Sequence, residues 1–252
     1  MPHPKEHIFN FVEGEMLLID KPLDWTSFDV VKNLRAFIKR TYNLKKFKIG
    51  HAGTLDPLAT GLLILCTGKM TKRIDEYQGM DKVYVGQMTL GATTPSYDKE
   101  TEPNQFFSIG NIQTEDLKKV SLKFKGEIEQ VPPVYSAIKI HGKRAYKYAR
   151  KDQDVQIKSR KVTIHQFDLL NFTPPLLDFS IKCSKGTYIR SLVSDFGKSL
   201  NNGAYLSSLR RTKIGDYSVN DAITIDDFKQ KVLSQMQNNS PDRFEKPITP
   251  KP

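Results

Sequence analysis

Apolar and polar positions alternate in blocks that predict short strands and helices along most of the chain. An apolar run at 16–19 predicts a buried strand, which the turn Asp20-Lys21-Pro22 ends. Thr26 and Asp29 have the spacing of a capping box, and apolar residues follow at helical spacing to about Arg40. The stretch from His51 to Gly61 lacks either period and predicts a loop.

The same periods predict the remaining elements. Strands are predicted at 62–66, 82–90, 124–130, 161–170 and 177–184. Helices are predicted at about 71–77, 115–122, 143–151 and 189–200, and after a cap formed by Thr224 and Asp227. Strands and helices mix without a βαβ rhythm, a nucleotide loop or a repeat, which favours one α+β domain. We expect this domain at 14–237, an N-terminal extension at 1–13 and a flexible polar tail at 238–252.

Composition places the chain among globular proteins. Of 252 residues, 38% are hydrophobic and 27% are charged, so enough apolar material is present for a core and a disordered chain is excluded. Cys66 and Cys183 lie far apart in apolar or strand-like segments and are expected to be reduced, mostly buried thiols. The first residues lack the apolar segment of a secretory signal, and the run 62–66 is too short to cross a membrane. We therefore expect a soluble, cytoplasmic protein.

The net charge of +11 is concentrated in three blocks. Seven Lys or Arg lie between Asp29 and Asp56 with no acid among them, nine lie within 139–161, and seven lie within 182–213. The second block also interleaves tyrosines with its cations. A single block is commonly a solvated helix face, but three of them favour a surface that follows an RNA phosphate backbone.

The loop around Asp56 holds the most unusual candidate for chemistry. Glycines and Pro57 impose an irregular backbone there, with one carboxylate in the middle. Asp56 is the only acid between Asp29 and Asp75, so we expect a positive field to hold it ionised. Because a lone carboxylate repels phosphate, its place on such a surface favours a nucleophile or a base. An Asp that only caps the turn before Pro57 fits the residues alone nearly as well.

Several motifs occur in a fixed order along residues 14–215. They are Leu18-Ile19-Asp20-Lys21-Pro22, Gly50-His51-Ala52-Gly53-Thr54-Leu55-Asp56-Pro57, Asp81-Lys82-Val83-Tyr84, the segment from Gln130 to Lys139, Cys183-Ser184-Lys185-Gly186-Thr187-Tyr188-Ile189-Arg190 and Leu209-Arg210-Arg211. Together they resemble the motifs of pseudouridine synthases of the tRNA Ψ55 type and their guide-RNA-dependent relatives. The resemblance implies the pseudouridine synthase fold, with a mixed, largely antiparallel sheet flanked by helices and RNA-binding loops.

The resemblance also implies roles for three residues in catalysis. Asp56 would attack the ribose or otherwise assist cleavage of the glycosidic bond, through a ribosyl-enzyme or a glycal intermediate. Tyr84 would stack on the target base, and its phenol would lie near the sugar to help move a proton. Arg190 would pair with Asp56 and orient its carboxylate.

Five further residues are implied in substrate binding. Tyr188 would form a hydrogen bond or a wall beside Asp56, and Leu209 would pack against the base. His51 would contact or displace bases of the T loop as the target flips out. Lys21 and Lys72 would contact phosphate or a loop. A packed Tyr188, a core Leu209, a backbone-bonded His51 and two solvated lysines are the alternatives.

The segment 131–151 resembles a thumb that closes over the T stem-loop of tRNA. Its Pro pair, Gly142 and its mixture of cations and aromatics suit a segment that becomes ordered on RNA. The candidate RNA contacts in it are Lys139, Lys143, Arg144, Tyr146 and Arg150.

The implied reaction conserves bond order, so no cofactor or metal is expected, and the five histidines show no ligand spacing. The expected partner is tRNA, acted on by a monomer with no obligatory protein partner. About forty residues follow Arg211, and we expect no C-terminal RNA-binding barrel of the kind that many relatives carry. A tRNA-folding chaperone or a non-catalytic RNA-binding module on the same fold is the alternative function.

Overall fold

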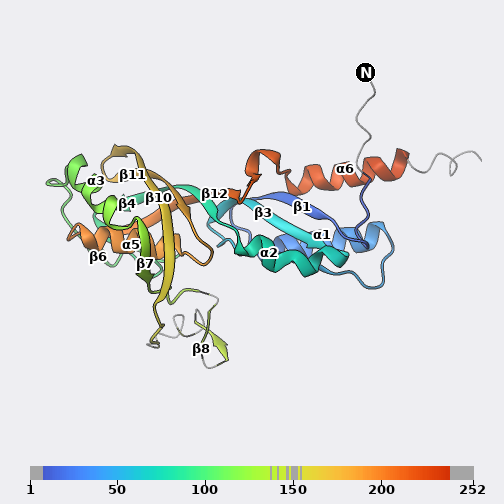
Figure 1. The fold of residues 1–252 in the computed structure, drawn as a ribbon, viewed down its shortest axis with the longest axis horizontal. Coiled ribbons are helices and arrows are strands. Elements are labelled where there is room, and N and C mark those ends of the chain that lie inside the picture. Colours follow the sequence, from blue (N-terminus) through green and yellow to red (C-terminus); the bar gives the residue numbers. More distant parts are fainter. Residues whose placement is uncertain are drawn as a thin grey trace, which may run out of the picture.

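A computed structural model describes residues 8–238 apart from 137, 141, 146, 147, 149–152 and 154. The described chain is elongated, with two lobes that share one nine-stranded sheet (Figure 1). The central strand is β12 (Ala204–Ile214), which pairs with β3 (Ala59–Thr67) of one lobe and with β4 (Lys82–Leu90) of the other. The two lobes are therefore connected through main-chain hydrogen bonds.

The other elements are distributed along this sheet. Its remaining strands are β1 (Met16–Lys21), β2 (Ile49–His51), β7 (Gly126–Gln130), β10 (Arg160–Thr173), β11 (Leu176–Cys183) and β13 (Tyr217–Ser218). Two small hairpins consist of β5 (Ala92–Thr93) with β6 (Gln105–Phe106), and of β8 (Lys139–Ile140) with β9 (Lys143–Arg144). The helices are α1 (Ser27–Thr41), η1 (Gly68–Arg73), α2 (Ile74–Gly79), α3 (Thr114–Lys123), α5 (Ile189–Ser199), η2 (Val219–Asp221) and α6 (Ile225–Asn238).

The strand order of the large sheet is β1-β3-β12-β4-β11-β10-β7, with β2 paired to β3 and β13 to β12. Strands β3 and β12 are parallel, and the other pairs are antiparallel. This arrangement confirms the predicted α+β class with a mixed, largely antiparallel sheet.

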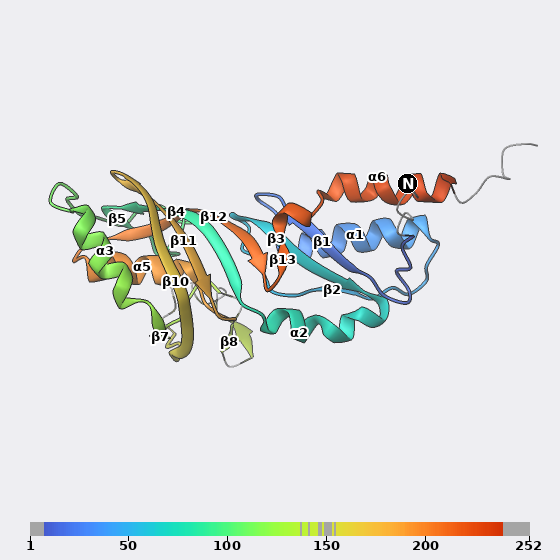
Figure 2. The same cartoon turned by 45° about the horizontal axis from the view of Figure 1, so that its top comes forward.

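The lobe built on β1 and β3 carries helices on both faces of the sheet. Leu63 and Leu65 pack with α1 and α6, whereas Ile64 and Cys66 pack with α2 on the other face. Figure 2 shows α2 on one side of these strands and α1 with α6 on the other. Phe11 is buried in the first of these cores, so part of the segment expected to be an N-terminal extension belongs to this lobe.

The other lobe packs α3 and α5 against β10, β11 and β12. Its core contains an aromatic group in which Phe167 contacts both Phe179 and Phe196. Eight residues of α5 are buried and the helix packs against β12, so the start of this helix has a fixed position at the junction of the lobes.

Most predicted elements are confirmed within a few residues, and β4 agrees at both ends. Two predictions were wrong or incomplete. The helix predicted at 143–151 is contradicted at its start, where β9 pairs with β8. The predicted loop is shorter because β3 already begins at Ala59. The largest omission is β12, whose many polar residues hide a central strand.

Candidate active site

A cleft of about 620 Å³ lies where the two lobes meet. One side is formed by residues 53–56 and the end of α2, and the other by the turn before α5 and the start of β10. Tyr84, Leu209 and Arg211 line it from the central strands. The cleft therefore brings together motifs that lie more than 150 positions apart in the sequence.

Contacts from three elements fix the loop that carries Asp56. At the start of α1, the Ser27 hydroxyl accepts a hydrogen bond from the Leu55 N–H at 2.8 Å and donates to the Leu55 carbonyl at 3.1 Å. Lys21 Nζ donates to the carbonyl of the residue after Asp56 at 3.3 Å. Arg211 Nη2 donates to the carbonyl three residues before Asp56 at 3.0 Å. These bonds leave the loop little freedom.

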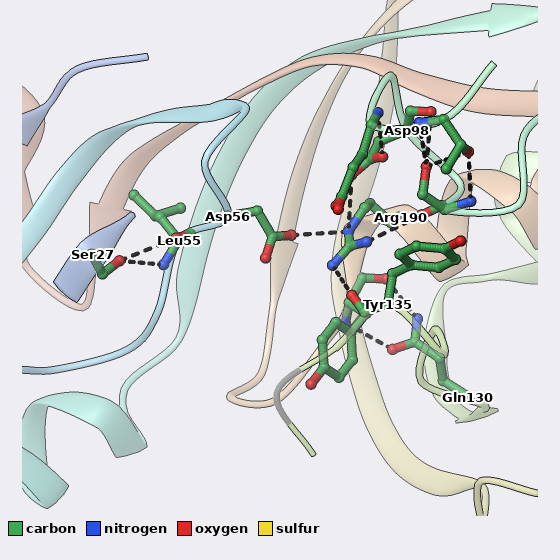
Figure 3. A network of polar contacts seen from close by, with 11 residues as sticks. Ser27, Leu55, Asp56, Asp98, Gln130, Tyr135 and Arg190 are labelled. Atoms are coloured by element: carbon green, nitrogen blue, oxygen red, sulfur yellow. Dashed lines mark hydrogen bonds and ion pairs between the residues drawn. The ribbon is translucent and has the colours of Figure 1, made fainter. Parts of the chain in front are cut away.

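Asp56 faces an arginine that connects several parts of the second lobe (Figure 3). Arg190 Nε lies 2.9 Å from Asp56 Oδ2 and 3.4 Å from Asp98 Oδ2. Its two terminal nitrogens donate to the carbonyls of Ser96 at 3.1 Å and Tyr135 at 2.9 Å. The side chain of Arg190 is 5% exposed, whereas that of Asp56 is 42% exposed, so the carboxylate is oriented from behind and open to the cleft.

The electrostatic surroundings of Asp56 differ from the simple positive field that its neighbours in sequence predict. Burial raises the pKa of Asp56 above the ordinary carboxyl value; Arg190 opposes this rise and Asp98 adds to it. The cationic neighbour is thus partly neutralised by a second acid. A carboxylate with a raised pKa is a stronger base than a carboxylate in water, which suits Asp56 to act as a base or a nucleophile.

Strand pairing places Tyr84 next to Arg211. The two residues are direct partners across β4 and β12, and Leu209 lies on the same face two positions along. Burial raises the pKa of the Tyr84 phenol, while a hydrogen bond from Arg211 opposes the rise. Arg210 points to the opposite face and pairs with Asp20 at 2.7 Å. Of the two adjacent arginines, only Arg211 belongs to the cleft.

Tyr188 forms part of the cleft wall at the beginning of α5. Its backbone N–H and carbonyl bond the Gln130 side chain at 2.8 and 3.0 Å. The Arg160 guanidinium lies 4.6 Å from the centre of the Tyr188 ring. A cation at this distance stabilises the ring in place, so the aromatic surface is presented in a fixed orientation.

Three of the predicted substrate contacts lie outside the cleft. Lys21 is fully buried, and its ammonium donates to three carbonyls, so contact with phosphate is contradicted and contact with a loop remains. Burial lowers the pKa of Lys21 to about 8. His51 ends β2, and its half-buried ring has a pKa lowered by burial and by Arg211. Lys72 is exposed on η1 away from the cleft.

The base of the predicted thumb is tied to the active-site helix. Ser191 on α5 donates to the Val131 carbonyl at 2.8 Å, and Arg190 bonds the Tyr135 carbonyl. The hairpin of β8 and β9 projects from this lobe (Figure 1) and contains Lys139, Lys143 and Arg144. The other two candidate thumb contacts, Tyr146 and Arg150, lie outside the described residues.

Three charged residues of the site were missed by the sequence reasoning. Asp98 lies in a polar turn after β4 and shows no local pattern that would connect it with Arg190. Lys82 and Arg211 lie inside recognised motifs, yet they are 5% and 1% exposed and line the cleft. The available signal was that Lys82 shares a motif with Tyr84 and that Arg211 shares one with Leu209.

Within the described ranges, no group of three or more His, Cys, Asp or Glu residues is arranged to hold a metal ion. No helix in the same part of the chain has the length and apolar character needed to cross a membrane.

Comparison with known proteins connects this site to a family. Residues 39–189 match the TruB family pseudouridylate synthase N-terminal domain, and residues 190–250 match the tRNA pseudouridylate synthase B C-terminal domain. The described part of the second match, 190–238, comprises most of α5 followed by β12, β13, η2 and α6.

Curated relatives resemble the chain over almost their entire length. The tRNA pseudouridine synthase B of Flavobacterium johnsoniae is 53% identical over 223 residues, which are 88% of this chain and 97% of that protein. The protein of the same name from Phocaeicola vulgatus is 49% identical, over 88% of this chain and 94% of its own length.

Solved structures extend the likeness to the fold. A chain of a Cbf5-Nop10-Gar1 complex is similar with a TM-score of 0.67 and 28% identity over 91% of this chain. A chain of an H/ACA RNP bound to a substrate RNA containing 2'-deoxyuridine gives a TM-score of 0.65 and 26% identity over the same share. The present chain spans 57% and 56% of those two longer chains. From its sequence, its fold and the residues of its cleft, the chain belongs to the TruB family of pseudouridylate synthases.

Proposed function

We propose that this protein isomerises a uridine of tRNA to pseudouridine, at position 55 in the T loop. The observation that carries the proposal is the Asp56–Arg190 ion pair, in which a carboxylate held from behind is open to a cleft of nucleoside size. The relatives named tRNA pseudouridine synthase B, which this chain covers almost completely, support tRNA as the substrate.

The proposed reaction needs only groups that the cleft supplies. The bond between the ribose C1' and the uracil N1 breaks with the assistance of Asp56, and the electron pair leaves with N1. The uracil turns within the cleft, its C5 bonds to C1', C5 loses a proton and N1 gains one. Atoms and electrons balance without an oxidant, a reductant or a nucleotide.

Two neighbours of Asp56 have distinct tasks in this reaction. Arg190 fixes one carboxylate oxygen, so the other remains available to the ribose. Tyr84 presents its ring to the base and its phenol to the sugar, where it assists proton movement. Leu209 and Tyr188 add an apolar surface on which the base turns.

The position of the site requires the target uridine to leave its stack. Asp56 lies in a cleft between two lobes, and a base within a folded loop cannot reach it in place. Arg160, Lys161 and Lys185 line the cleft rim and suit the phosphates on either side of a flipped nucleotide. The segment 131–151 then closes over the T stem-loop from a base anchored to α5.

The alternative, an RNA chaperone or binding module without catalysis, leaves the Asp56–Arg190 pair unexplained. A binding surface for a polyanion gains nothing from a carboxylate in its centre. The proposal includes a cytoplasmic monomer that acts without a guide RNA or a protein partner; in its support, the chain is 53% identical to a tRNA pseudouridine synthase B and 28% identical to a chain of the Cbf5-Nop10-Gar1 complex.

The direct test is to incubate the purified protein with an unmodified tRNA transcript and to map pseudouridines by carbodiimide modification and primer extension. The proposal predicts one modified uridine, in the T loop, without added cofactor. The absence of pseudouridine from a transcript that the protein binds would favour the chaperone alternative.

A further inference from the structure

Two buried cations form the floor of the cleft beside Tyr84. Lys82 precedes Tyr84 by two positions on β4, and Arg211 is the partner of Tyr84 across β12, so the three side chains share one face of the sheet. Lys82 is 5% exposed and Arg211 is 1% exposed, and both line the cleft. The reaction as described above assigns no task to either charge.

Among the described residues, neither cation forms an ion pair with an acid. In the described part of the chain, Lys82 Nζ donates to the carbonyls of Gln78 at 2.7 Å and Met80 at 2.5 Å. Arg211 Nε donates to the Leu62 carbonyl at 2.8 Å, and its Nη2 bonds the loop before Asp56. These acceptors are neutral, so no carboxylate is hydrogen-bonded to either charge in the described part of this partly desolvated cleft. Arginine and lysine are rarely buried in this way.

A purely structural role explains the hydrogen bonds but not the charges. Lys82 ties the end of α2 to the sheet, and Arg211 ties the Asp56 loop to β12. Neutral donors satisfy carbonyls equally well, without the cost of burying an ion. Two like charges beside the reacting base therefore indicate that an anion forms there during the reaction.

We propose that Lys82 and Arg211 stabilise the negative charge that uracil carries while it is detached from the ribose. The proposal rests on the function proposed above. When the bond from C1' to N1 breaks, the electron pair stays with uracil and spreads over N1 and the two carbonyl oxygens. Fixed cations lower the energy of this anion through their field across the cleft, without solvent reorganisation. The charge disappears when C5 bonds to C1', and the proton that C5 then loses is balanced by the proton that N1 gains.

The proposal is tested by changing the charge and the leaving group independently. Single-turnover cleavage of the target nucleoside is measured for the wild type, Lys82→Met and Lys82→Arg, with Lys119→Met on the exposed face of α3 as the matched loss of a distant cation. Each is assayed at mildly acidic pH on T-arm RNA that carries uridine or 5-fluorouridine at the target. Fluorine withdraws electrons and stabilises the uracil anion by itself.

The expected result is that Lys82→Met slows cleavage of uridine by about tenfold to hundredfold, while tRNA affinity is retained. The rate loss of Lys82→Met is several-fold smaller on 5-fluorouridine, because cleavage of a better leaving group depends less on the electrostatic field of the two cations. Lys82→Arg recovers most of the rate that Lys82→Met loses, since it keeps the charge, whereas Lys119→Met stays within about threefold of the wild type, since it is remote. Equal losses by Lys82→Met on both substrates, or no loss on either, would overturn the proposal.

A pH profile provides a second readout, which stands even if Lys82→Met does not fold. Burial and the nearby Arg211 lower the pKa of Lys82 to about 8. Around it lie Arg211 from β12, Cys183 from β11, Asp81 immediately before β4 and Lys185 from the turn before α5. Cys183, with a pKa raised to about 12, stays neutral in this range.

The wild-type rate on uridine should therefore fall as the pH rises through about 8, where Lys82 loses its charge. In Lys82→Arg this fall moves to higher pH, because a guanidinium keeps its proton. Lys21 also has a pKa of about 8 but is unchanged in the variant, so a shift identifies Lys82. An unshifted profile contradicts the proposal, whereas a wild type that forms no pseudouridine at any pH refutes the proposed function itself.

Discussion

The wall and the floor of the cleft use charge in opposite ways. On the wall, Arg190 lies between two carboxylates, Asp56 and Asp98, so acids balance its charge, and its two terminal nitrogens donate to backbone carbonyls. On the floor, the hydrogen bonds that Lys82 and Arg211 make to described residues go to neutral carbonyls and to the Tyr84 phenol. The wall is arranged to position a group, and the floor is arranged to hold a positive field.

This difference shows why the two regions tolerate different changes. A balanced ion pair depends on geometry, because the Arg190 guanidinium reaches Asp56, Asp98 and two backbone carbonyls at once. A field depends mainly on charge and falls gradually with distance. Substitutions that preserve charge but alter shape should therefore damage the wall more than the floor.

Among these variants, the largest loss of rate is expected from a substitution in the wall of the cleft. Arg190→Met should reduce the single-turnover rate by about 10³-fold, because Asp56 loses its orientation and Asp98 is left as a buried acid without a cation. Filter binding to tRNA should change little. If the rate falls by less than about tenfold, the ion pair does not position the catalytic carboxylate.

Arg211→Met should come next, with a rate loss of about 10²-fold and a lower thermal midpoint. The loss combines a weaker floor field with the release of the Gly53 and Leu62 carbonyls, each costing about 1–3 kcal/mol if it stays buried and unpaired. The neighbouring Arg210→Met removes a charge on the opposite face and serves as the matched comparison. A rate loss as large in Arg210→Met would show that the two faces of β12 are not functionally distinct.

Asp98→Asn should change the pH dependence of the reaction rate more than it changes tRNA binding. Asp56 must be ionised to react, so the rate falls as the pH drops through its pKa, which burial and Asp98 raise. Removing the Asp98 charge lowers the pKa of Asp56, and the acidic limb of the pH–rate profile should move to lower pH. Movement to higher pH would contradict this account of the wall.

The smallest effect is expected at the rim. Lys161 pairs with Glu127 at 2.7 Å and is mostly exposed, so Lys161→Ala should weaken tRNA binding only a few-fold. The slope of log K against log salt should become shallower by about one if this lysine contacts a phosphate. Lys119→Ala on α3 should leave that slope unchanged.

The sequence alone predicted most of the elements that carry the site, but not which charged residues are buried in it. The capping box of α1, strand β4 and the loop of Asp56 follow from local patterns, and these position two of the catalytic candidates. Strand β12 was missed because Arg210 and Arg211 appear as polar, exposed positions, whereas one pairs with Asp20 and the other is buried. Only strand pairing decides which of them enters the cleft.

Long-range contacts explain the other differences. Asp98 meets Arg190 only because α5 and the turn after β4 pack together, and no spacing in the sequence connects them. Lys21 was expected to contact phosphate or a loop because its motif resembles one of the family, and sequence alone does not show whether such a lysine is buried. Its actual partners, the carbonyls of Pro22, Trp25 and Pro57, arise from the way the chain folds back over β1.

The most direct test of the central claim is the activity of Asp56→Asn, an isosteric change that removes the charge and the nucleophile. Pseudouridine formation on a T-arm transcript is measured under single-turnover conditions beside tRNA binding and thermal melting. We predict that modification is abolished while binding and the thermal midpoint are retained, because the loop is held by Ser27, Lys21 and Arg211 rather than by the carboxylate. Undiminished turnover by Asp56→Asn would contradict the account.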